Sequence, residues 1–194
     1  MSGFVSLILP TCLLMVAVMV ADVHGKCSAW NTIQNSHICK KNQVLSIGFT
    51  KNNPIKCDQE FDSTSLPVDP LRITYADAKQ KTDYLMIMVD PDAPYPNNPI
   101  CRYYLHWMVD NILGVDLMAG NIKNGNIIME YTRPNPPSRS SDHRYQIFLL
   151  LSPKTQISAI KKRCGFDLHA FLHKYKLCNS PVALFQFKAA AGLT

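Results

Sequence analysis

The chain has 194 residues, of which 47% are hydrophobic and 18% charged, and its formal net charge is +6 at pH 7. This length suits one domain with a sizeable core. Only Lys161-Lys162-Arg163 forms a dense basic run. Beyond the charge itself, nothing in the composition therefore indicates a nucleic-acid partner.

The first 25 residues are predicted to be a secretory signal peptide. An apolar core spans residues 4–21, and the small residue Gly25 precedes the expected cleavage site at Lys26. The alternative is an uncleaved membrane anchor, because the apolar run is almost long enough to span a bilayer. We favour cleavage, since no basic stop sequence follows immediately, and expect a secreted protein.

Residues 26–194 are expected to form a single domain, in which residues 26–43 are an N-terminal extension. Cleavage would remove Asp22 and no lysine or arginine, so the mature chain would be one charge more basic. A mildly basic secreted domain favours acidic partners such as anionic lipid surfaces. The simpler interpretation is that this charge keeps the protein in solution.

The expected domain has an even number of cysteines, which predicts three disulfides in an exported chain. They are Cys27, Cys39, Cys57, Cys101, Cys164 and Cys178. The sequence leaves their pairing open. Local bridges close the shortest loops, so we expect Cys27–Cys39 and Cys164–Cys178, with Cys57–Cys101 remaining. A zinc site is not expected, because paired C-x-x-C spacing is missing.

Short apolar runs separated by proline and glycine turns predict a series of strands. These are residues 44–49, 71–75, 84–89, 103–109, 126–131, 143–151 and 182–187. Two stretches are expected to be loops: residues 57–70, with two prolines, and residues 110–125, with three glycines.

Helical signals are confined to two stretches near the C-terminal end. Residues 157–163 are predicted to form a short helix. Residues 167–176 have apolar side chains at helical spacing, with Asp167 as the expected N-cap. Many short strands and one or two short helices predict an all-β fold, an antiparallel Greek-key β-sandwich.

Two motifs place polar side chains at strand ends. Asp90-Pro91-Asp92-Ala93-Pro94 follows the apolar run 84–89, and His106 lies inside the next strand. These residues can form a polar pocket at one end of a sheet. Alternatively, the prolines shape a loop and His106 is a hydrogen-bonded core residue.

The second motif is a proline-rich loop, Pro134-Asn135-Pro136-Pro137, that leads to Asp142-His143-Arg144-Tyr145 at the mouth of another strand. With both motifs in this order and spacing, the chain resembles the phosphatidylethanolamine-binding proteins (PEBP) over about residues 44–187. The resemblance implies a large β-sandwich with a small anion pocket at one end.

The resemblance also implies which side chains bind the ligand. They are Asp90, Pro94, Tyr104, His106, Asn135, Pro136, Pro137, His143 and Tyr145. Side chains alternate along a strand, so His143 and Tyr145 share a face. The two histidines and Tyr145 can donate hydrogen bonds to a phosphate, while Asp90 can fix a histidine tautomer or bind an ammonium group.

Neighbouring residues are expected to shape this pocket. Asn135 takes the place of a glycine that usually precedes the Pro-Pro pair, so the pocket is expected to be narrower or its ligand different. Tyr104 takes the aromatic position before His106. Asp92 is expected to be structural and to pair with Arg144 or Arg102.

We expect a binding protein for phosphatidylethanolamine-like headgroups or small phosphate anions, with no catalytic residues, cofactor or metal. Its expected partners are such a headgroup or anion, a membrane surface, and a protein such as a protease. One alternative is a serine protease inhibitor or other protein-regulatory factor. A less favoured alternative is a metal-dependent hydrolase built on Asp90, His106 and His143. No serine or cysteine nucleophile lies in a recognised motif.

Overall fold

A computed structural model describes residues 27, 30, 38–40, 45–179 and 181–192. The strands of the small sheet are β1 (Ser46–Thr50), β2 (Asn53–Pro54) and β4 (Arg72–Thr74). The strands of the large sheet are β3 (Glu60–Asp62), β5 (Asp83–Asp90), β6 (Tyr104–Leu113), β7 (Asn126–Met129), β8 (His143–Leu151) and β9 (Ala183–Ala190). The helical elements are η2 (Ile38–Lys40), η3 (Ser63–Ser65), α2 (Gly114–Ala119), η4 (Ile122–Asn124) and α3 (Leu168–Lys174).

The large sheet contains a Greek key, as the sequence predicts. Its strand order is β3-β9-β8-β5-β6-β7, so β8 returns to lie beside β5 after the meander β5-β6-β7. These four strands pair antiparallel. The one departure from the predicted antiparallel arrangement is β3, which pairs parallel to β9 at the sheet edge.

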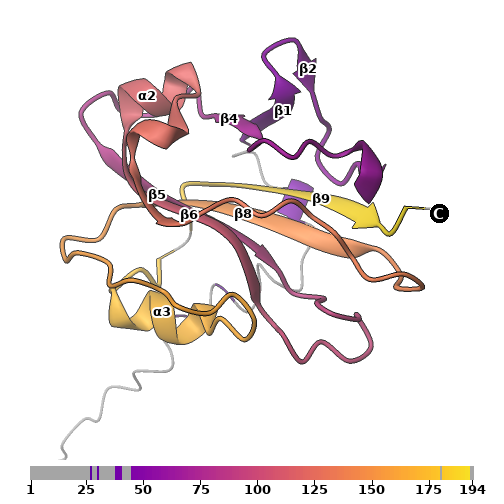
Figure 1. Cartoon of the computed structure of the whole chain (residues 1–194). Helices are drawn as coiled ribbons and strands as arrows, with labels where there is room; N and C mark the ends of the chain where they lie inside the picture. The colour runs from indigo at the N-terminus through magenta and orange to yellow at the C-terminus, as the bar shows by residue number, and fades with distance from the viewer. Residues whose placement is uncertain (1–26, 28–29, 31–37, 41–44, 180, 193–194) are drawn as a thin grey trace, which may run out of the picture.

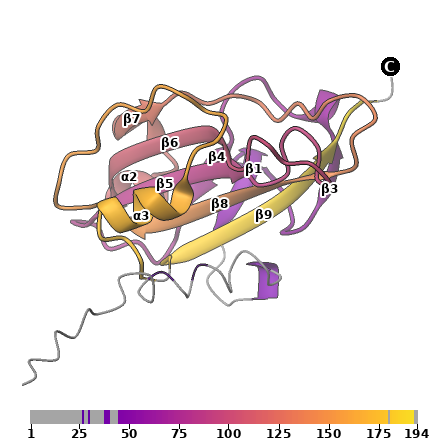
Figure 2. The same ribbon diagram turned by 90° about the horizontal axis from the view of Figure 1, so that it is seen from below.

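Three layers enclose two cores. The small sheet and α2 lie over one face of the large sheet, and α3 lies against the other face (Figure 1). Strand β5 contributes to both cores, because Met86 and Met88 face the small sheet while Leu85 and Ile87 face α3. Seen from below, α3 lies over the strands β5 and β8 (Figure 2). A strand that is buried on both faces is continuously apolar.

Helix α3 confirms the predicted amphipathic helix. The Asp167 carboxylate accepts a hydrogen bond from the Ala170 backbone N–H at 2.8 Å, which caps the first turn. Leu168, Phe171 and Leu172 are buried against the large sheet.

The prediction of a loop over residues 110–125 is wrong. Strand β6 continues to Leu113, and α2 and η4 follow it. Gly114 starts α2 where a Cβ would collide with the Lys79 backbone, and Gly120, with φ of 80°, ends it in the left-handed region. These two glycines mark the ends of a helix that is too short to show a periodic pattern.

Two other predictions also fail. Residues 57–70, expected to be a loop, contain β3 and η3, each only three residues long. Residues 157–163 do not form the predicted helix. Their backbone instead hydrogen-bonds to distant elements: Arg163 accepts from the Leu105 N–H, and Ser158 donates to the Tyr175 hydroxyl.

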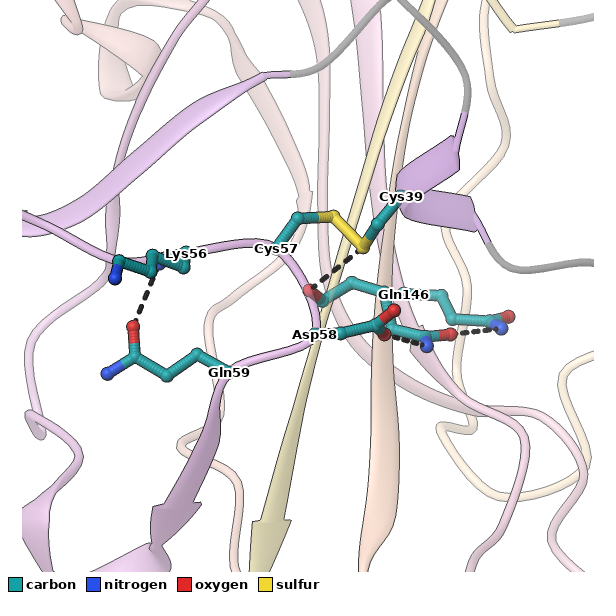
Figure 3. Close-up of a disulfide and its surroundings, with 7 residues drawn as sticks. Cys39, Lys56, Cys57, Asp58, Gln59 and Gln146 are labelled. Atoms are coloured by element: carbon teal, nitrogen blue, oxygen red, sulfur yellow. Dashed lines mark hydrogen bonds between the residues drawn. A yellow bond between two sulfur atoms is a disulfide. The ribbon is translucent and has the colours of Figure 1, made fainter.

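The expected disulfide pairing is wrong at every cysteine, because near neighbours in sequence lie apart in the fold. The bridges join Cys27 to Cys178, Cys39 to Cys57 and Cys101 to Cys164. Figure 3 shows the bridge from Cys39 in η2 to Cys57 beside Asp58 and Gln146. Cys101 meets Cys164 where reciprocal backbone hydrogen bonds join Tyr103 to Phe166.

No helix among the described residues is long and apolar enough to cross a membrane. The predicted signal peptide, residues 1–25, lies outside the described residues, as does most of the predicted N-terminal extension.

Removal of a disulfide should destabilise the domain by an amount that increases with the logarithm of the number of residues in the loop that it closes. Cys101–Cys164 spans 63 residues and Cys39–Cys57 spans 18. In denaturant titrations we expect Cys39→Ala/Cys57→Ala to cost about 3 kcal/mol and Cys101→Ala/Cys164→Ala about 4 kcal/mol. Non-reducing peptide mapping should recover the three pairs. A map with Cys27 joined to Cys39 would contradict this fold.

Candidate functional site

The predicted site residues meet at one cavity of about 310 Å³ at an end of the large sheet. All nine of them line it: Asp90, Pro94, Tyr104, His106, Asn135, Pro136, Pro137, His143 and Tyr145. The last residue of β5, Asp90, pairs with the first residue of β6, Tyr104, and β8 begins beside them. Antiparallel pairing therefore brings three strand ends to the same place.

Asp90 and His143 form the buried centre of this site. Asp90 Oδ2 lies 2.7 Å from His143 Nδ1, and the two residues are 2% and 1% exposed. Asp90 Oδ1 accepts the backbone N–H of Asp92 at 2.7 Å. Because the carboxylate is an acceptor, the proton of neutral His143 lies on Nδ1. Asp90 thus fixes a histidine tautomer, as the sequence led us to expect.

His143 also contacts a residue that the sequence analysis did not select. Its Nε2 lies 2.9 Å from the Ser140 hydroxyl. With the proton on Nδ1, Nε2 is an acceptor and Ser140 is the donor. Neutral His143 therefore donates no hydrogen bond to the cavity.

His106 is constrained in a similar way. Its Nδ1 lies 2.8 Å from the Thr132 carbonyl oxygen, which can only accept a hydrogen bond. Burial lowers the pKa of His106, although the Thr132 hydrogen bond and Asp90 act in the opposite direction. The neutral ring donates from Nδ1, which leaves Nε2 as an acceptor. The expected pair of histidine donors is thus replaced by an acceptor on each ring.

Tyr145 retains its hydroxyl proton over the physiological pH range. Burial, followed by the nearby charges of Asp90 and Asp92, raises the Tyr145 pKa. Its ring stacks on Phe187 with centroids 5.2 Å apart and meets the edge of His106 at 5.1 Å. Tyr145 is therefore a fixed hydrogen-bond donor in the wall of the cavity.

Asp92 has the structural role predicted for it. Its carboxylate accepts two hydrogen bonds from the Arg144 guanidinium, at 2.8 and 2.7 Å, and one from the Arg144 backbone N–H at 2.9 Å. Arg102 instead donates to the Pro91 carbonyl at 2.8 Å. Arg144 points to the opposite face of β8 from His143 and Tyr145, as strand alternation requires.

Four residues that line the cavity were missed: Ala93, Cys101, Thr132 and Arg133. Arg133 matters most for the chemistry, because it is the only lysine or arginine among the lining residues. The available signal was its position immediately before Pro134 in the proline-rich loop. No sequence pattern indicated that Cys101 would line the cavity, because its position there depends on its disulfide to Cys164.

A metal site on Asp90, His106 and His143 finds no geometric support. Within the described part of the chain, no group of three or more His, Cys, Asp or Glu residues is arranged to hold an ion. In both histidines Nδ1 is already hydrogen-bonded to an oxygen of the protein.

The Asp92–Arg144 pair should make stability depend on acid pH. Burial raises the Asp92 pKa, but its hydrogen bonds to Arg144 outweigh burial and lower the value in the fold. A lowered carboxyl pKa stabilises the fold at pH values above the unfolded pKa of about 4, and this stabilisation is lost as the pH falls through the lower pKa of the folded state. We expect Asp92→Asn to lower the free energy of unfolding by about 1–3 kcal/mol at pH 7, a modest range because Arg144 is 35% exposed. At pH 3 the cost should be smaller, because Asp92 is then closer to being protonated in the wild type.

Thermal unfolding from pH 7 to pH 3 would measure this difference, with Asp142→Asn as the control at an exposed carboxylate immediately before β8. An Asp92→Asn penalty that does not change with pH would contradict the assigned role.

Comparisons with known proteins agree with this geometry. Residues 36–187 match the family model for phosphatidylethanolamine-binding protein. The chain is 32% identical over 149 residues to the putative odorant-binding protein A5 of Drosophila melanogaster, a match that covers 73% of this chain and 67% of that protein.

Two solved structures share the fold at 17% sequence identity. A carboxypeptidase Y inhibitor, complexed with its cognate proteinase, superimposes with a TM-score of 0.64 over 89% of this chain and 98% of the inhibitor. The phosphatidylethanolamine-binding protein from Plasmodium vivax superimposes with a TM-score of 0.58 over 86% of this chain and 96% of that protein. From the family match and the fold together, the chain belongs to the phosphatidylethanolamine-binding protein family.

Proposed function

We propose that this protein is a secreted binding protein for a small zwitterionic phosphate headgroup, phosphoethanolamine being the model ligand. The observation that carries the proposal is that one cavity has residues of opposite charge in its lining, Asp90 and Arg133. A ligand with one cation and one anion matches that pair better than inorganic phosphate does.

The acceptors of the cavity suit an ammonium group. The Asp90 carboxylate already accepts hydrogen bonds from the Asp92 N–H and His143, and a carboxylate has further lone pairs. Nε2 of neutral His106 is a second acceptor. An ammonium group has three donors and no acceptor, so it complements both groups.

The donors of the cavity suit a phosphate. Arg133 supplies a permanent charge, and an arginine fork matches two phosphate oxygens. Tyr145 supplies a neutral hydroxyl donor. The prolines Pro94, Pro136 and Pro137 add apolar surface, which strengthens these polar contacts by excluding water.

Size favours a headgroup over a whole lipid. The cavity volume of about 310 Å³ lies at the lower end of the range for small-molecule sites. In this proposal the acyl chains of a phospholipid stay outside, in the membrane. Tyr95 and Ile100 are 41% and 73% exposed on the loop between Pro94 and Cys101, where apolar side chains can meet a bilayer. The similarity to a putative odorant-binding protein also supports a small ligand.

Secretion is supported by the disulfides. All six cysteines after the proposed signal peptide are paired. Disulfides persist mainly in oxidising compartments. We therefore retain cleavage at Lys26 and an extracellular location as part of the proposal.

Protease inhibition is the second candidate, favoured by the fold that the chain shares with almost the whole carboxypeptidase Y inhibitor. A serine carboxypeptidase assayed with increasing amounts of the mature domain would test it. Unchanged hydrolysis at a large excess of the domain would remove this candidate.

Arg133→Gln should weaken phosphoethanolamine binding about tenfold or more, because a hydrogen bond to a charged group contributes about 1.5–3 kcal/mol. Arg139→Gln is the matched control, since Arg139 is exposed and does not line the cavity. Isothermal titration with phosphoethanolamine, inorganic phosphate and ethanolamine would compare the variants. Absence of saturable binding to phosphoethanolamine, or an equal loss in both variants, would refute the proposal.

Cleavage of the signal peptide gives a separate expectation. Expression of the full chain in a eukaryotic secretory system should release into the medium a protein whose N-terminal residue is Lys26. Membrane-bound protein that retains residues 1–25 would instead support the anchor.

A further inference from the structure

We propose that Ser140, His143 and Asp90 form a nucleophilic triad, and that Ser140 reacts with small carboxylic esters. The Ser140 hydroxyl lies 2.9 Å from His143 Nε2, and His143 Nδ1 lies 2.7 Å from Asp90 Oδ2. This activity goes beyond headgroup binding. Such triads are recognised by geometry and not by residue order.

The proton positions suit a general base. Asp90 holds the proton of neutral His143 on Nδ1, so the free lone pair on Nε2 faces the Ser140 hydroxyl. Activation of a serine nucleophile requires that its hydroxyl be hydrogen-bonded to a base, and that a third group orient this base. Asp90 is itself held by the Asp92 N–H, and Asp92 by Arg144.

The acid and the histidine of the triad are buried, and its serine is partly exposed. Asp90 and His143 are buried, whereas Ser140 is only partly buried. The Ser140 N–H donates to the Pro137 carbonyl at 3.1 Å, which closes a tight turn. Arg139, immediately before Ser140, has a φ of 64°, in the region that non-glycine residues rarely adopt. Such strain is typical of loops that present a functional side chain.

The cavity offers a place for the ester. His143 and Asp90 line it together with Arg133, the cation available to stabilise negative charge on a carbonyl oxygen. Ser140 is not among the lining residues, and it adjoins the cavity through His143, whose Nε2 lies 2.9 Å from the Ser140 hydroxyl. A volume of about 310 Å³ limits the substrate to a short acyl ester.

The reaction is a two-step acyl transfer to water. Ser140 Oγ forms a bond to the ester carbonyl carbon while its proton passes to His143 Nε2. The bond to the alkoxy oxygen then breaks, and that oxygen takes the proton from His143 as the alcohol leaves. Water attacks the acyl-serine with His143 as base, which releases the carboxylic acid and restores Ser140.

A fluorophosphonate probe tests the triad, because it forms a stable bond with a serine that such a base activates. We expect mass spectrometry of the labelled mature domain to place the probe on Ser140, and p-nitrophenyl acetate to be hydrolysed. Ser140→Ala should remove both signals. Asp90→Asn and His143→Gln should each slow labelling by about a hundredfold or more.

Ser138→Ala is the matched control, because Ser138 is exposed in the same loop and the hydroxyl bonded to His143 Nε2 is that of Ser140; its labelling should equal that of wild type. Near-UV circular dichroism would confirm that each variant is folded. Absence of label on folded wild-type protein, under conditions that label a serine esterase, would overturn the proposal. So would equal labelling rates in wild type and in folded His143→Gln. The phosphoethanolamine titration needs no reaction at Ser140, so the two proposals fail separately.

Discussion

The hydrogen bond between Asp90 and His143 joins the end of β5 to the start of β8, and the candidate site is arranged around it. A carboxylate so deeply buried needs hydrogen-bond donors, and the Asp92 N–H and His143 supply them. The same contact fixes the proton of neutral His143 on Nδ1. Because the proton is on Nδ1, Nε2 is a hydrogen-bond acceptor and can accept the hydroxyl of Ser140.

Alternation along β8 divides its first three side chains between two faces. His143 and Tyr145 lie toward the cavity, whereas Arg144 turns away and neutralises Asp92. Asp90 ends β5 and contacts His143, whereas Asp92 lies in the loop beyond β5 and contacts Arg144, so the two acids have different tasks. Asp92 anchors the loop to β8, while Asp90 remains available to the cavity. Arg133, on a different loop, is the positively charged residue in the lining of the same cavity.

Binding and nucleophilic chemistry make different demands on His143. A headgroup needs charges in fixed places, and Asp90 and Arg133 meet that need without a proton transfer. A nucleophile needs a free imidazole lone pair, which the Asp90 contact supplies at Nε2. One buried pair thus serves both proposals, and a ligand that filled the cavity would exclude an ester from it.

The sequence by itself determined the Greek-key sheet and helix α3, because strand and helical spacings are local patterns. It also determined the nine residues around the cavity, through two motifs that resemble those of the phosphatidylethanolamine-binding proteins. Tertiary structure decided the rest. Cys101 meets Cys164, and Arg133 reaches the cavity, only through contacts between segments far apart in sequence. The roles of His106 and Ser140 depend on hydrogen-bond partners at about 3 Å, and hydrophobic patterning carries no information on such distances.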